Sequence, residues 1–166
     1  MSVRRAQAGD AARLGEIHVR TWQAAYEHVF GADRLAGMRA ERRTEQWQGW
    51  LADGVDAWVF EDEAGAVVGF VWIGGSREAE DEGELFAIYV LPEAWGSPAG
   101  RELMAVARDA LRAAYPTSIL WVLEDNPRAR RFYEREGWEP DGGRQEEELL
   151  GATVTEVRYR LSETGT

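Results

Sequence analysis

GELFAIYVLPEAWGSPAGRELMAVARDAL, residues 83–111, is the stretch that decides the fold. From Leu85 to Leu91 both alternating faces are apolar, which is typical of a central strand buried on its two sides. Pro92 ends this strand, and a turn of small residues leads into apolar positions that recur at helical spacing from Leu103 to Ala114. We expect N–H groups at the start of this helix to face an anion beyond the strand end.

Apolar segments on both sides of this stretch complete a sheet. Residues 119–123, ILWVL, form a second strand that is apolar on both faces, so strand, helix and strand predict a right-handed parallel crossover. Residues 57–61 and 66–73 predict a hairpin, and residues 138–150 and 153–161 predict an antiparallel pair. We therefore expect one α/β (α+β) domain over residues 1–166, with a mostly antiparallel sheet of six or seven strands, a central parallel pair and about four helices.

The composition limits the classes of function. The hydrophobic fraction of 45% and charged fraction of 30% predict a soluble globular protein. No apolar run is long enough for a bilayer and no signal peptide is recognisable, so we expect a cytoplasmic protein with no membrane partner. The net charge of −11 argues against a nucleic-acid partner. The absence of cysteine excludes a thiol nucleophile and a thiolate metal site, and we expect no metal.

Two stretches, residues 95–101 and 124–138, indicate a site. Each alone has a structural explanation: Ser97 and Pro98 can simply start a helix. In the second stretch a helix face packed on the sheet would account for Ala129, Phe132, Tyr133 and Glu136. Because both stretches follow parallel strands, we expect them to meet at the same edge of the sheet.

These stretches resemble the GNAT superfamily of acyl-CoA-dependent N-acyltransferases. Its turn usually reads Gln or Arg, Gly, any residue, Gly, any residue, then Gly or Ala. This chain keeps Gly96 and Gly100 but has Trp95 at the first place and Pro98 at the middle glycine. The second stretch matches the family pattern at Asn126, Arg128, Ala129, Phe132, Tyr133, Gly137 and Trp138. The resemblance covers residues 83–141 and implies two splayed parallel strands at the centre of the sheet.

The resemblance implies acetyl-CoA as co-substrate. Amides of the turn would converge on its pyrophosphate, the backbone of residues 88–90 would bind the pantetheine arm, and Asn126 would approach that arm. Pro98 supplies no N–H, and Arg101 can add a charge-assisted contact to a phosphate. The cofactor-binding residues implied are Ile88, Tyr89, Val90, Trp95, Gly96, Ser97, Pro98, Ala99, Gly100, Arg101, Asn126, Ala129, Phe132 and Tyr133.

The implied reaction is transfer of an acetyl group to a primary amine of a small molecule, an amino acid derivative or a peptide or protein N-terminus, by direct attack. Tyr133 would protonate the departing thiolate. The amine must lose a proton first, and Glu84 is the first candidate to accept it, as the one charged side chain in an apolar central strand. A carboxylate in solvent at the strand end is an equally good interpretation of Glu84.

The acceptor site and the partners are less constrained. In such folds the first helices wall the acceptor pocket, which nominates Trp22 and Tyr26, with Trp47 and Trp50 as further aromatic residues that also fit a core. A homodimer is compatible with the sequence. The departures at Trp95 and Pro98 favour an alternative, a catalytically degenerate acyl-CoA-binding sensor or scaffold; a binding domain without a CoA site is a third.

Overall fold

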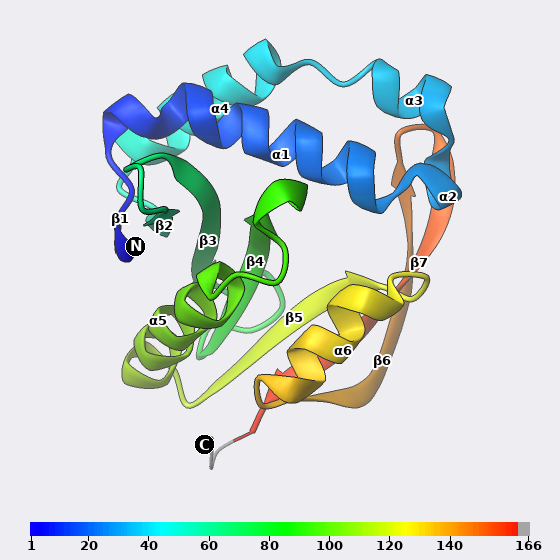
Figure 1. Ribbon diagram of the computed structural model, residues 1–166. Coiled ribbons are helices and arrows are strands. Elements are labelled where there is room, and N and C mark those ends of the chain that lie inside the picture. Colours follow the sequence, from blue (N-terminus) through cyan, green and yellow to red (C-terminus); the bar gives the residue numbers. More distant parts are fainter. Residues whose placement is uncertain (163–166) are drawn as a thin grey trace.

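A computed structural model describes residues 1–162. One seven-stranded sheet runs through the molecule in the order β1-β2-β3-β4-β5-β7-β6 (Figure 1). Neighbouring strands are antiparallel except β4 and β5, which are parallel, so the predicted mixed and mostly antiparallel sheet is confirmed. The strands are β1 Ser2–Arg5, β2 Asp56–Glu61, β3 Val67–Gly75, β4 Glu82–Val90, β5 Thr117–Leu123, β6 Trp138–Leu149 and β7 Ala152–Leu161.

The described helices outnumber the four that we expected because the first helical region is interrupted. Gly31 has a φ of +80°, which glycine adopts readily, and separates the short helices α2 and α3; Gly37 then follows α3. No helix within residues 1–162 is long and apolar enough to cross a membrane. The α-helices are α1 Ala11–Ala25, α2 Glu27–Phe30, α3 Ala32–Ala36, α4 Ala40–Ala52, α5 Ala99–Ala114 and α6 Pro127–Arg135.

Helices cover both faces of the sheet (Figure 1). Phe70 on β3 faces Trp47 of α4, with ring centroids 5.0 Å apart, whereas a Cβ on the preceding Gly69 would face Leu103 of α5. Because successive strand residues point to opposite faces, α1 and α4 lie on one side and α5 on the other. Both sides exclude water, which explains why β3 and β4 read as almost continuously apolar.

The central parallel strands diverge after a short paired segment. Their register runs from Glu82 beside Thr117 to Leu85 beside Leu120. Beyond that point β4 continues along β3, while β5 continues along β7. The predicted splay of the parallel pair is thus confirmed, and the backbone of β4 after Leu85 is left without a strand on its β5 side.

Candidate active site

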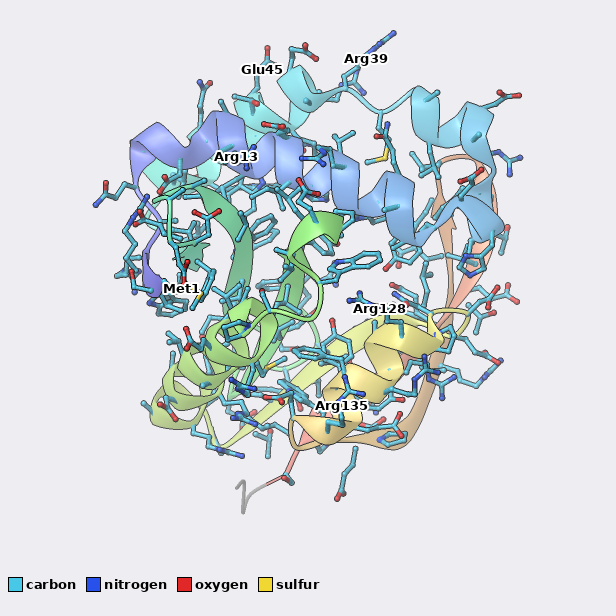
Figure 2. The ribbon with its side chains drawn as sticks, viewed as in Figure 1. Met1, Arg13, Arg39, Glu45, Arg128 and Arg135 are labelled. Atoms are coloured by element: carbon cyan, nitrogen blue, oxygen red, sulfur yellow. The ribbon has the colours of Figure 1, made fainter. Side chains whose placement is uncertain are left out.

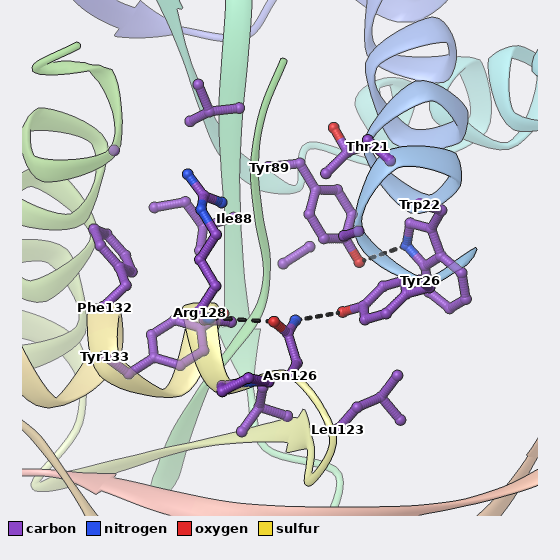
Figure 3. Close-up of a pocket in the computed structure, with 18 of the residues that line it drawn as sticks. Thr21, Trp22, Tyr26, Ile88, Tyr89, Leu123, Asn126, Arg128, Phe132 and Tyr133 are labelled. Carbon is purple, nitrogen blue, oxygen red and sulfur yellow. Dashed lines mark hydrogen bonds between the residues drawn. The ribbon is translucent and has the colours of Figure 1, made fainter. Parts of the chain in front are cut away.

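A cavity of about 880 Å³ lies where β4 and β5 diverge. Its walls come from α1, the second half of β4, the end of β5 and α6 (Figure 3). The turn before α5 and the β6–β7 hairpin also line it. The two stretches that indicated a site in the sequence therefore meet at one cavity, which α1 and the β6–β7 hairpin also line.

The turn before α5 presents three of the five amides expected to converge on an anion, those of Gly96, Ser97, Ala99, Gly100 and Arg101. The Ser97 N–H donates to the Ala94 carbonyl at 3.1 Å, and the Ala99 N–H donates to the Ser97 hydroxyl at 3.3 Å. The amides of Gly96, Gly100 and Arg101 donate to no acceptor within the described residues, and these three residues line the cavity. Free amides at the start of a 16-residue helix suit an anion.

Pro98 interrupts this arrangement less than its place in the motif suggested. Helix α5 begins at Ala99, so Pro98 occupies the capping position, where its missing N–H removes no bond from the helix. Its carbonyl accepts the first helical bond, from the Glu102 N–H at 3.0 Å. Among the described residues, Pro98 and Ala99 do not line the cavity.

Trp95 holds an arginine from another element. Its indole N–H donates to the Val90 carbonyl at 2.8 Å, so that carbonyl, one of the groups expected to bind the pantetheine arm, is already occupied. The guanidinium of Arg128 on α6 lies 3.7 Å from the centroid of the Trp95 ring, a cation–π contact. Arg101 and Arg135 line the same cavity, so these arginines give part of its wall a positive charge (Figure 2 labels Arg128 and Arg135).

Two hydrogen bonds tie the walls of the cavity together across large sequence separations (Figure 3). Asn126 caps α6, its side-chain oxygen accepting from the Ala129 N–H at 3.2 Å, and its Nδ2 donates to the Tyr26 hydroxyl at 3.1 Å. The Trp22 Nε1 donates to the Tyr89 hydroxyl at 3.0 Å. Trp22 and Tyr26, nominated for the acceptor, thus line the cavity, whereas Trp47 and Trp50 belong to the core and are absent from its described lining.

Tyr133 is 8% exposed and lies on the cavity side of α6 (Figure 3). Burial, followed by the neighbouring Tyr26 and Tyr89, raises the pKa of its phenol well above the ordinary value of 10.0. No hydrogen bond within the described part of the chain contributes to that shift. The phenol is therefore protonated at neutral pH and available to a group inside the cavity.

Glu84 does not join Tyr133 in the described cavity lining. It lies in the paired half of β4, beside Ile119, before the strands diverge. The side chain is also not in solvent: Glu84 is 2% exposed and accepts a hydrogen bond from Arg77 Nη2 at 3.1 Å. Burial raises the pKa of its carboxyl, and Arg77 opposes that shift. Arg77 itself reaches the cavity.

Four carboxylates that the sequence analysis did not assign to the site line the cavity: Asp125, Glu136 and, on the sheet, Glu147 of β6 and Glu156 of β7. Glu156 stands opposite Gln145, whose Nε2 donates to Glu156 Oε1 at 3.0 Å. Burial raises the pKa of the Glu156 carboxyl, and Glu147 raises it further. The signal was present in the alternation of β7, because Val157 and Tyr159 face the core and Glu156 must then face the other side.

A mixed sheet whose parallel strands diverge beside a turn with free amides defines the acyl-CoA N-acyltransferase class of fold. Comparison with known families agrees: residues 13–138 match the model of the acetyltransferase (GNAT) family. The chain belongs to this family, which confirms the resemblance found in the sequence.

Individual relatives support the assignment. The uncharacterized N-acetyltransferase YuaI of Bacillus subtilis is 32% identical over 130 residues, which cover 76% of this chain and 74% of that protein. The mycothiol acetyltransferase of Streptomyces griseus is 41% identical over 75 residues, 45% of this chain and 24% of that protein. The structure of the PaiA N-acetyltransferase of Thermoplasma acidophilum with coenzyme A is 16% identical and superposes with a TM-score of 0.73 over 94% of this chain and 96% of its own.

Proposed function

We propose that this protein transfers an acetyl group from acetyl-CoA to a primary amine. The observation that carries the proposal is the cavity between β4 and β5, which joins a positively charged wall to a buried and protonated tyrosine. The family supplies the reaction class, and two fold neighbours were solved with CoA or acetyl-CoA, the second a putative acetyltransferase of Salmonella typhimurium with a TM-score of 0.73.

The residues present fit a CoA diphosphate. The amides of Gly96, Gly100 and Arg101 are free within residues 1–162, and the side chains of Arg101 and Arg128 add charge to the same wall. A Cβ at Gly100 would lie 3.3 Å from the Phe132 ring of α6, so a larger residue would require that ring to shift by a few tenths of an ångström. We assign phosphate binding to these groups.

The remaining residues of the cavity divide the other tasks. The edge of β4 at Ile88 and Tyr89, unpaired on the β5 side, would bind the pantetheine arm, with Asn126 on the other side. When bound, acetyl-CoA supplies an electrophilic thioester carbonyl. Tyr133 would donate a proton to the departing sulfur, because its phenol is protonated at working pH.

A screen tests this proposal. The protein is incubated with acetyl-CoA and a panel of primary amines, and free thiol is measured, while isothermal titration calorimetry measures CoA binding. We expect CoA to bind and thiol to be released with at least one amine. A protein that fails to bind CoA would contradict the proposal.

A second candidate function is an acyl-CoA sensor without turnover. It is favoured by the turn, in which Ser97 and Ala99 use their amides internally and Pro98 has none. This candidate predicts CoA-dependent thermal stabilisation and no thiol release with any amine of the panel.

A further inference from the structure

One wall of the cavity, formed by Glu147 and Glu156 with the apolar side chains of Leu123 and Leu149, is here called the acidic wall. We propose that the acidic wall binds the ammonium group of an acceptor with an apolar body, and that Glu156 takes up its proton. The inference rests on the proposed function, since it names the acceptor class and the base for that reaction.

The fold places Glu156 in this wall for a simple reason. Strand β7 lies between β5 and β6, and Glu156 pairs with Leu123 on one side and Gln145 on the other. Leu123 belongs to a cluster with Tyr26, which lies between α1 and α2, and with Phe30 of α2, so this face of the sheet is the one that the N-terminal helices cover. The carboxylate therefore projects between the sheet and these helices, into the cavity.

The carboxylate of Glu156 is held in place but not neutralised. Gln145 donates to Oε1, and within the described residues no arginine forms an ion pair with Glu156. By contrast, Glu84 is paired with Arg77 and lies outside the described lining. Of the two carboxylates, Glu156 is the one that an acceptor in the cavity can reach.

The charged and titratable groups around Glu156 favour a cation. Glu147 is its neighbour on the hairpin, and the charge of Arg77 in the β3–β4 loop lowers the pKa of Glu156. The charge of Glu156 in turn raises the pKa of Tyr26 and of Tyr89. Burial is the largest cause of its raised pKa, with Glu147 adding to the rise and Gln145 and Arg77 opposing it. A raised pKa makes a carboxylate a better proton acceptor near neutral pH.

The same wall selects the rest of the acceptor. The rings of Trp22 and Tyr26, with centroids 4.9 Å apart, lie beside Leu123 and Leu149, and all four residues line the cavity. An apolar or aromatic body suits this surface. A carboxylate on the carbon next to the amine would face Glu147 and Glu156 and be repelled, so we infer an amine without such a group.

The transfer balances with the residues available. The ammonium gives one proton to Glu156, and the nitrogen lone pair then forms the N–C bond to the thioester carbonyl. The C–S bond breaks and sulfur takes the Tyr133 proton, while the second nitrogen proton returns to the Tyr133 oxygen through water. Glu156 releases its proton to solvent, so the products are amide, thiol and one proton.

Binding and turnover of simple probes test the inference. With CoA present, isothermal titration calorimetry compares 2-phenylethylamine with its neutral isostere 2-phenylethanol and with phenylalanine. We expect the wild type to bind the amine at least about tenfold more tightly than either competitor. Glu156→Gln should lose most of that preference and about 10²-fold of amine turnover, with a flattened rise of rate with pH.

The matched control is Glu146→Gln, the same charge change at an exposed position next to Glu147 and outside the described lining. It should behave as the wild type, and thermal unfolding should show all variants folded; Glu156→Asp, which keeps the charge, should retain the preference for the amine. Equal binding of amine and alcohol by the wild type, or Glu156→Gln matching the control, would overturn the inference. If thiol release is absent with every amine, the proposed function fails instead.

Discussion

Replacing Tyr133 with phenylalanine removes one oxygen atom from the cavity and little else. The ring keeps its neighbours Phe132 and Tyr159, whose centroids lie 5.7 Å and 6.3 Å away. Since no hydrogen bond of this hydroxyl within the described residues contributes to its pKa, we expect no protein hydrogen bond to be lost. We expect the free energy of unfolding to change by less than about 0.5–1 kcal/mol.

The effect on turnover should be large because the lost group is a proton donor. General acids contribute roughly 10²–10⁴-fold to rate, and each tenfold corresponds to about 1.36 kcal/mol, so we expect the activation barrier to rise by about 2.7–5.4 kcal/mol. The free amides and arginines that we assign to the diphosphate are untouched, so the dissociation constant for CoA should stay within about twofold.

The assay follows thiol release at saturating acetyl-CoA and amine, with calorimetry for CoA and thermal unfolding for stability. Tyr115→Phe is the matched control, because Tyr115 lies at the end of α5 and outside the described lining of the cavity. A Tyr133→Phe variant that turns over like this control would refute the role of Tyr133. The raised pKa of Tyr133 adds a second check, since its deprotonation should cause no loss of activity between about pH 7 and 9.

Three further changes test other parts of the structure. Trp95→Ala removes the ring under Arg128, a cation–π contact worth about 0.5–2 kcal/mol, so calorimetry should show CoA affinity reduced by roughly 2- to 30-fold; unchanged affinity would show that this pair does not serve the phosphates. Gly15→Ala places a Cβ 2.7 Å from Thr44 Oγ1, where α1 meets α4. The overpacking should cost about 1–3 kcal/mol and lower the melting temperature by roughly 2–12 °C. An unchanged melting temperature would mean that the two helices separate freely. Burial, and then the charge of Arg43, lowers the pKa of His18 from 6.5 to about 3. Below pH 6.5 the unfolded chain therefore binds a proton that the folded chain does not, and urea titrations should show the free energy of unfolding decreasing by up to about 1.4 kcal/mol for each unit by which the pH is lowered. His18→Leu should lose this dependence on pH.

The sequence was sufficient to predict the strands of the sheet because the pattern of apolar side chains along a strand shows which of its faces are buried. Residues 85–91 are apolar on both faces, and β4 is the central strand; the apolar strand 119–123 follows a helix, and β4 and β5 are parallel. The same patterns could not show where these strands part. Divergence changes which backbone groups are hydrogen-bonded, and it leaves the apolar side chains on the faces of the strands as they were.

That missing information decides which carboxylate meets the cavity. Glu84 stood out in the sequence as a charge among apolar neighbours, yet it lies in the paired segment and is occupied by Arg77. Glu156 lay unnoticed in an ordinary alternating strand, and its importance depends on the register that sets it beside Leu123 at the open end of β5. Register across strands distant in sequence is a tertiary property, so composition and periodicity along one strand could not rank the two.

The departures from the family turn, Trp95 and Pro98, also could not be interpreted correctly from the sequence alone. Taken alone, Trp95 and Pro98 predicted a weakened anion site. In the folded chain Pro98 stands before the helix, where an N–H is not needed, and the Trp95 ring lies against the guanidinium of Arg128. The family turn has Gln or Arg at this first position; in this chain the guanidinium beside the turn is that of Arg128 on α6, which lines the cavity. Only their 3.7 Å separation, set by the packing of α6 against the turn before α5, shows that Trp95 and Arg128 form one arrangement.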